Sequence, residues 1–241
     1  MADLVAYIPI LTTLLSLPFA MLVLRRYLEK LRAGEERRTH LIWWSIGIFL
    51  FGAGTLAEGF TTLFGWHEPV FRAWYIAGAL LGGAPLAQGT VYLLIARPLA
   101  DRMAIVAFGY VALAAFFVLI VPVDASLADD KVLRGEVIEW RWVRLFSPLI
   151  NTYAFIFLVG GAVWSAWYYW RGERADARVL GNLLIAAGAI LPGIGGSFSR
   201  AGQTEVLYVA EFIGIILIYL GYRVMSPPAA LGLIRFRRQV G

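Results

Sequence analysis

The chain has 241 residues, of which 60% are hydrophobic and 15% are charged, and its 21 Lys and Arg residues outnumber its 16 Asp and Glu residues. A soluble domain carries roughly 25% charged residues, so this composition excludes an ordinary soluble enzyme. Cysteine is absent, which excludes disulfides, thiolate chemistry and cysteine-ligated metals.

Continuous apolar runs divide the chain, and each is long enough to cross a bilayer as a helix, which needs about 20 residues. We expect spans at 4–24, 41–63, 70–96, 103–122, 145–170, 179–198 and 205–224. The first run is not a cleaved signal peptide, because no basic residue precedes it and Arg25 and Arg26 follow it directly. Apolar and polar residues do not alternate within these runs, which argues against an outer-membrane β-barrel. The predicted fold is an all-α, polytopic seven-transmembrane helix bundle over 1–225, followed by a short basic cytoplasmic tail at 226–241.

The charges between the spans are asymmetric. Of the 21 basic residues, 15 fall in the first, third and fifth connections and the tail, and 6 fall on the other side. The positive-inside rule then predicts an N-out/C-in protein of the bacterial cytoplasmic (inner) membrane. The basic residues lie at span ends and form no continuous stripe, so no nucleic-acid partner is expected. The longest connection, between the fourth and fifth spans, contains a segment at 133–142 that we expect to form an interfacial hairpin or helix.

Small residues and prolines recur inside the spans. Glycines allow helices in lipid to approach closely, and they stand at positions 78, 82, 160, 161, 188, 193, 195 and 196. Pro85 and Pro192 lie in glycine-rich surroundings and are the candidate helix breaks near the midplane. With Gln88 they would line a path if the protein were a transporter.

Ionisable residues within spans are the main functional signal, because a charge in lipid is costly unless it is paired or hydrated. Glu58 in the second span and Glu211 in the seventh both fall in the outer half. We expect Arg72 and Arg200 to be the cations near them. The orienting groups of a ligand-binding site would be Asn151, Gln203 and Tyr208. The alternative is that these groups form two ion pairs that only lock neighbouring helices together.

Other chemistry has little support. The two histidines, His40 and His67, are expected on opposite sides of the membrane and cannot share a metal or a haem. The only lysines, Lys30 and Lys131, are expected in loops, which excludes covalent retinal. No nucleophile–base pair or metal set is visible, so we expect no catalytic residues, no metal and no cofactor, and hence no enzyme.

Four stretches resemble a set of bacterial seven-span membrane proteins with no attached activity: 54–59 (GTLAEG), 71–75 (FRAWY), 88–94 (QGTVYLL) and 180–188 (LGNLLIAAG). The layout is more distantly similar to the seven-span sensory module of some histidine kinases. Arg72, Trp74, Tyr75 and Pro85 look superficially like microbial rhodopsins, which carry a retinal lysine that this chain lacks.

These patterns favour a sensory or ligand-binding module with an outward-facing polar cavity. Its ligand would be a small polar molecule, and its output would pass to a separate protein partner on the cytoplasmic side of the bilayer. The alternatives are a small-solute transporter or permease, and an accessory structural subunit of a membrane complex.

Overall fold

The protein is a bundle of seven long apolar helices. The computed structural model describes residues 2–35, 38–172 and 176–226. Seven helical segments are long and apolar enough to cross a membrane: Ile8–Arg32 (α2), Thr39–Phe64 (α3), Glu68–Leu94 (α4, η1 and α5), Arg97–Ile120 (α6), Arg141–Arg171 (η4, α7, η5 and α8), Asp176–Arg200 (α9) and Thr204–Met225 (α10). The described part contains no β-strand. The all-α fold and the seven spans are therefore confirmed, and the chain is a multi-pass membrane protein.

The first span differs most from its prediction. A short helix, Ala2–Val5 (α1), precedes it, and α2 continues to Arg32, eight residues past the predicted end at 24. The added residues, 25–32, include Leu, Glu, Lys and Arg, which have high helix propensity. Lys30, expected in a loop, consequently lies in the last turn of α2. The predicted tail at 226–241 lies outside the described residues apart from Ser226.

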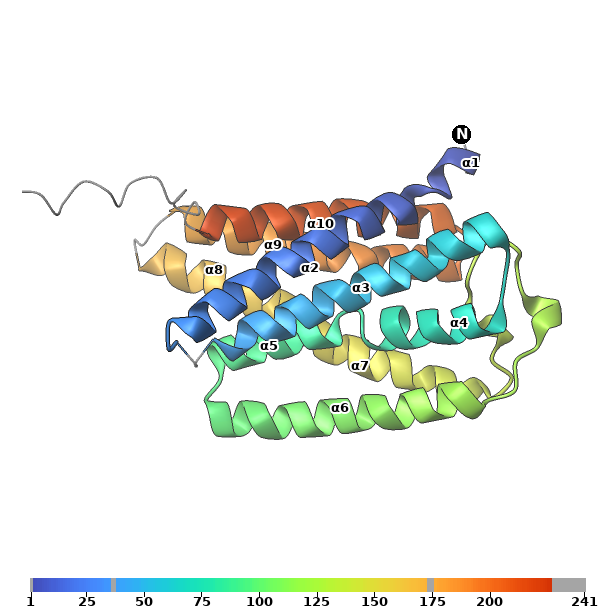
Figure 1. Ribbon diagram of the computed structural model, residues 1–241, viewed down its shortest axis with the longest axis horizontal. Helices are drawn as coiled ribbons and strands as arrows, with labels where there is room; N and C mark the ends of the chain where they lie inside the picture. The colour runs from blue at the N-terminus through green and yellow to red at the C-terminus, as the bar shows by residue number, and fades with distance from the viewer. Residues whose placement is uncertain (1, 36–37, 173–175, 227–241) are drawn as a thin grey trace, which may run out of the picture.

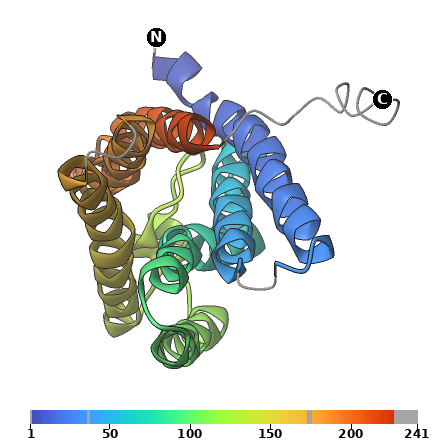
Figure 2. The ribbon, with the colours of Figure 1, turned by 90° about the vertical axis from the view of Figure 1, so that its left-hand side faces the viewer.

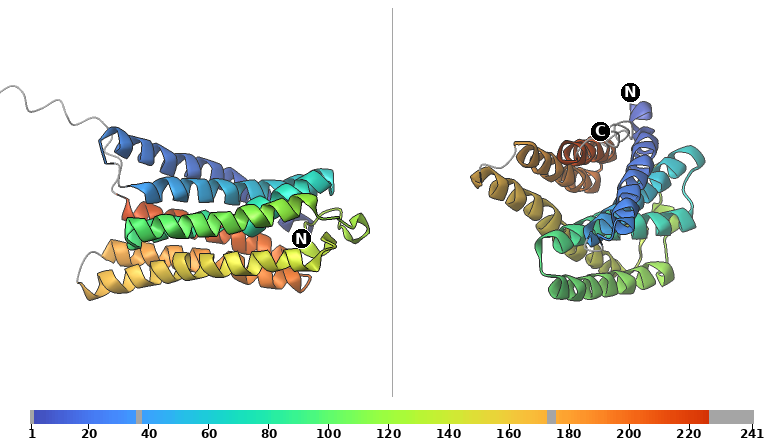
Figure 3. Two further views of the ribbon diagram at one scale, coloured as in Figure 1. Left: turned by 90° about the horizontal axis from the view of Figure 1, so that it is seen from below. Right: turned by 60° about the vertical axis from the view of Figure 1, so that its left-hand side comes forward.

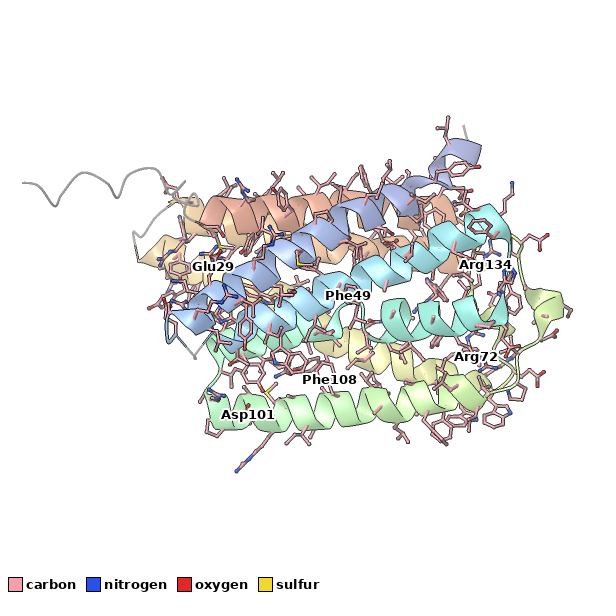
Figure 4. The ribbon with its side chains drawn as sticks, viewed as in Figure 1. Glu29, Phe49, Arg72, Asp101, Phe108 and Arg134 are labelled. Atoms are coloured by element: carbon pink, nitrogen blue, oxygen red, sulfur yellow. The ribbon has the colours of Figure 1, made fainter. Side chains whose placement is uncertain are left out.

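Six of the spans close into a ring, and α6 lies outside it (Figures 1 and 2). Around the ring, α2 packs on α3, α3 on α5, α5 on α7, η5 and α8, α8 on α9, α9 on α10, and α10 again on α2. The fourth span, α6, packs on α5, η1 and α7. Arg72 and Arg134 lie at the end that carries residues 121–145, and Glu29 and Asp101 lie at the other (Figure 4). We call these the loop end and the basic end.

Glycine contacts join α9 to α10 along their length. A Cβ atom on Gly188 would lie 2.5 Å from the carbonyl oxygen of Gly214, and one on Gly214 would lie 2.7 Å from that of Gly188. Gly181 and Gly221, seven residues away on each helix, make the same reciprocal contact. A seven-residue repeat keeps one seam of each helix facing its partner. The helices can therefore pack backbone to backbone only because these positions lack side chains.

The third span is broken. It consists of Glu68–Trp74 (α4), the π-helix Tyr75–Leu80 (η1), an irregular stretch at 81–83 and Ala84–Leu94 (α5). Pro85 lies in the first turn of α5, where a missing N–H group is tolerated. The predicted break at Pro85 is thus confirmed. A second π-helix, Phe155–Gly160 (η5), lies in the fifth span between Phe146–Ala154 (α7) and Gly161–Arg171 (α8).

The predicted break at Pro192 is wrong, because α9 runs through it from Asp176 to Arg200. Pro192 cannot donate a hydrogen bond to the carbonyl of Gly188 four residues earlier. Gly214 of α10 packs against this part of α9, since a Cβ atom on it would lie 2.7 Å from that carbonyl oxygen and 3.3 Å from Cδ of Pro192.

The loop between α6 and α7 covers one end of the bundle (Figure 3). It contains the 3₁₀ turns Ala125–Leu127 (η2), Gly135–Val137 (η3) and Arg141–Leu145 (η4). An isolated antiparallel bridge joins Val123 to Ile138. The predicted interfacial segment at 133–142 is thus one side of a bridged loop with short 3₁₀ turns. Hydrogen bonds from the Ser126 hydroxyl and backbone N–H lower the pKa of Asp124 at the start of η2.

Candidate functional site

Glu58 is buried in the loop-end half of the bundle, with 3% of its surface exposed. Its Oε1 atom accepts a hydrogen bond from the indole Nε1 of Trp74 at 2.9 Å. This contact follows from a close backbone approach between α3 and η1, where a Cβ atom on Gly54 would lie 2.9 Å from the α-carbon of Gly78. Because the two segments are antiparallel, Glu58 and Trp74 each stand one turn from that crossing and meet.

Glu211 reaches the same place from α10. The two carboxyl groups lie close enough for each to act electrostatically on the other. Tyr208, one turn before Glu211, is 3% exposed, and its hydroxyl lies within electrostatic range of both carboxyl groups. The structure therefore brings together three of the residues that the sequence singled out, Glu58, Tyr208 and Glu211.

The expected cations are not there. Arg72 forms an ion pair with Glu68, one turn earlier on α4, at 2.6 Å. The same guanidinium donates to the backbone carbonyls of Val118 and Val121 at the end of α6. Arg200 is exposed and has no ion pair among the described residues. The predicted ion pairs from Arg72 and Arg200 to Glu58 and Glu211 are therefore wrong, and the two acids face each other.

Asn151 has a partner of a different kind. Its amide donates to the carbonyl oxygen of Ala79 at 3.4 Å, and Ser147 donates to the same oxygen at 3.0 Å. Ala79 belongs to η1, where the broken helix leaves carbonyls without regular partners. In lipid such groups must be satisfied by neighbouring helices. Asn151 thus stabilises the break in the third span.

Gln203, the remaining predicted site residue, is exposed in the turn before α10.

Gln88, expected to line a path, is fully buried. Its Nε2 donates to the carbonyl oxygen of Ala100 at 3.0 Å, and its Oε1 accepts from the hydroxyl of Tyr153. Both ends of the amide are satisfied, so this residue ties α5 to α6 and α7.

A cavity of about 400 Å³ lies at the basic end, enclosed by α2, α3, α5, α8, α9 and α10. This volume falls in the range of small-molecule sites. Its inner walls are apolar and include the buried Val23, Ile48 and Leu86. Gly161 and Ala162 of the fifth span also line it, and at Gly161 α8 packs closely on α5, since a Cβ atom there would lie 2.5 Å from Cγ2 of Thr90. None of the predicted site residues lines this cavity.

Within the part of the chain that the structure describes, the charged residues that line the cavity are all basic: Arg26, Lys30, Arg38 and Arg178. Arg26 donates to the hydroxyl groups of Tyr222 and Ser226. The Arg178 guanidinium lies 5.0 Å from the ring centre of Tyr169. Neither arginine has an ion pair among the described residues. Two cations at this end therefore remain open to an anion.

The other two cations share one acid. Lys30 binds Glu35 at 2.7 Å, and Arg38 binds it at 3.1 Å. The hydrogen bond from Lys30, with a smaller contribution from Arg38, lowers the pKa of Glu35 below its ordinary value. Glu35 is thus an anion that the protein itself places beside its basic cluster.

Sequence reasoning missed this cavity because the positive-inside rule alone accounted for the basic residues around it. The signal that could have revealed it is the small face of the fifth span, Gly161, Ala162 and Ser165, opposite two aromatic residues at the start of the second, His40 and Trp44. Comparison with known proteins adds no assignment, since no family model, curated protein or solved structure matches this chain.

Proposed function

We propose that this protein is a ligand-binding membrane protein whose ligand is an amphipathic anion held in the cavity at the basic end. The observation that supports this most directly is the lining itself: apolar walls, four cations and, among the described residues, no Asp or Glu. An apolar chain would lie against Val23, Ile48 and Leu86, where it loses contact with water. An anionic head group would lie at the mouth, between Arg26 and Arg178. This interpretation moves the site from the outer half predicted from sequence to the other end of the bundle.

The positive-inside rule supports placing the basic end in the cytoplasm of a bacterium, with the N-terminus outside. The ligand would then come from the cytoplasmic leaflet or the cytosol. We propose a sensory role, in which occupancy of the cavity is passed to a separate protein at the same end. Binding without chemical conversion is part of this proposal.

Transport is a second candidate, and one observation favours it. The break in the third span, at 81–83, ends three residues before Leu86, which lines the cavity. Broken helices near the midplane are a feature of many transporters. Flux of a fluorescent single-chain carboxylate in proteoliposomes separates the two, because a sensor binds this probe without moving it.

Binding is tested with lauric acid, dodecyl sulfonate and dodecyltrimethylammonium added to the protein in nanodiscs, with melting temperature and Trp fluorescence as readouts. The two anions are expected to bind and the cation is not. Arg26→Gln and Arg178→Gln should each weaken anion binding about tenfold or more, since a hydrogen bond to a charged group contributes about 1.5–3 kcal/mol.

The matched control is Arg97→Gln, which removes an exposed arginine at the same end that does not line the cavity. Equal binding of the cation and the anions would overturn the proposal, as would equal losses in the control and the two lining variants.

A further inference from the structure

Three buried polar atoms lack a hydrogen-bond partner at one place in the loop-end half of the bundle: Oε2 of Glu58, Oε2 of Glu211 and the hydroxyl oxygen of Tyr208. A buried polar group without a partner costs free energy of the order of 1–3 kcal/mol, and more if it is charged. Such groups are rare in stable proteins. Their occurrence together points to something that the site binds.

The groups around the two acids indicate which kind of ligand would bind there. The influences on the two carboxyl groups are burial, the indole of Trp74 and the facing acid, and none of these is a cation. The indole of Trp74 from α4 donates to Glu58, and the hydroxyl of Tyr208 from α10 lies near both acids. The other ionisable groups with an electrostatic effect on this region are Tyr75, Asp129, Arg144, Arg200 and Glu205.

Two carboxylates cannot hydrogen-bond to each other, because each only accepts. A carboxylic acid beside a carboxylate can, since its O–H group donates to the partner's oxygen. Two like charges in contact inside a low-dielectric bundle are strongly unfavourable, and paired acids in such sites share a proton. One proton would satisfy both unpartnered carboxyl oxygens and halve the buried charge.

We propose that Glu58 and Glu211 form a proton-binding site between α3 and α10, in which one proton lies between the facing carboxyl oxygens. Trp74 holds the Glu58 side by donating to Oε1, and the hydroxyl of Tyr208 lies near the pair. Loss of the proton leaves two carboxylates that repel each other, which forces α3 and α10 apart or draws in water.

This site is separate from the cavity at the basic end. Ile48 and Ile218 line that cavity, and they stand ten and seven residues from Glu58 and Glu211, or about 15 and 10 Å along the helices. The proton site therefore does not depend on the proposed ligand.

Infrared difference spectroscopy of the full-length protein in nanodiscs tests the proposal, because a protonated carboxyl group has its own carbonyl band. Wild type is expected to show this band at neutral pH and lose it on titration with base. Glu58→Gln and Glu211→Gln should each shift the band, and the double variant should lack it. Glu139→Gln, which removes an exposed acid of the loop between α6 and α7, should leave it unchanged. A band that persists in the double variant overturns the proposal.

Trp74→Phe provides a test that keeps both acids. It removes the hydrogen bond to Glu58 and should shift the carbonyl band, and an unshifted band would contradict the site. Melting temperature gives an independent readout. It should fall in wild type as the band is lost with rising pH, and stay flat over that range in Glu211→Gln. A band that depends on sodium rather than on pH would identify a cation site instead and overturn the proton assignment.

Discussion

The contact between Gly188 and Gly214 gives the sharpest test of how this bundle is held together. We expect Gly188→Ala to destabilise the protein. The added Cβ atom would lie 2.5 Å from the Gly214 carbonyl oxygen, whereas ordinary contacts begin at 3.4 Å. Relief requires α9 and α10 to separate by roughly 0.9 Å, because the atom it meets is backbone and has no rotamer to change. Overpacking of this kind costs about 1–3 kcal/mol.

A second effect acts in the opposite direction. Alanine has a higher helix propensity than glycine, by about 0.8–1 kcal/mol. Gly196→Ala measures this effect alone, because a Cβ atom on Gly196, also in α9, would meet nothing within 4 Å. We therefore expect Gly196→Ala to be neutral or stabilising, and the difference between the two variants to equal the packing cost.

Unfolding in bicelles, followed by steric trapping, gives the free energies of both variants. Equal free energies of unfolding for Gly188→Ala and Gly196→Ala would refute the argument that backbone contact joins these helices. Gly214→Ala supplies a further check, since it should be destabilised like Gly188→Ala, and the double variant should lose less than the sum of the two.

Two more predictions concern the break in the third span and the basic end. The double variant Ser147→Ala and Asn151→Ala should destabilise the protein by about 1–3 kcal/mol in the same unfolding assay, because the carbonyl of Ala79 loses both side-chain donors. The control is Thr152→Ala, whose hydroxyl bonds only within its own helix. Equal stability of the double variant and this control would refute the prediction. Glu35→Gln should raise the affinity for dodecyl sulfonate, because it frees Lys30 and Arg38. The pKa of Glu35 is lowered in the folded protein, so its ion pairs hold above its ordinary pKa and are lost as pH falls through the lowered value. The wild type should therefore also gain affinity for dodecyl sulfonate in acid, while Glu35→Gln should not. Unchanged affinity in both proteins would contradict the idea that Glu35 competes with the ligand.

The spans could be predicted from sequence because a bilayer imposes a length and an apolarity that any crossing helix must meet. The meeting of Glu58 and Glu211 was also predictable in part, since both fall at similar depth. Their partners were not. Arg72 pairs with Glu68 four residues earlier, a local contact that the helical period permits, and it was overlooked in favour of a long-range pair.

Glycine patterns show a different limit. Gly188, Gly193, Gly195 and Gly196 look alike in the sequence, yet only Gly188 and Gly195 touch another helix. Rotation of α9 about its axis decides which of them do, and that rotation depends on α10. The cavity at the basic end could not be predicted for a similar reason. Its walls come from six helices, and the residues of any one span do not indicate that a cavity forms between them.

The glycine contacts between α9 and α10 also affect the order in which the walls of the cavity come together during synthesis. α9 and α10 are joined by a short turn at 201–203 and contact each other along their length, so they can associate soon after both have entered the membrane. They emerge after the other five spans of the described chain, and they supply the wall that includes Ile185 and Ile218. A nascent chain that ends after α8 would leave the pocket open to lipid along one side. The proposed ligand site is thus complete only once α10 has packed against α9.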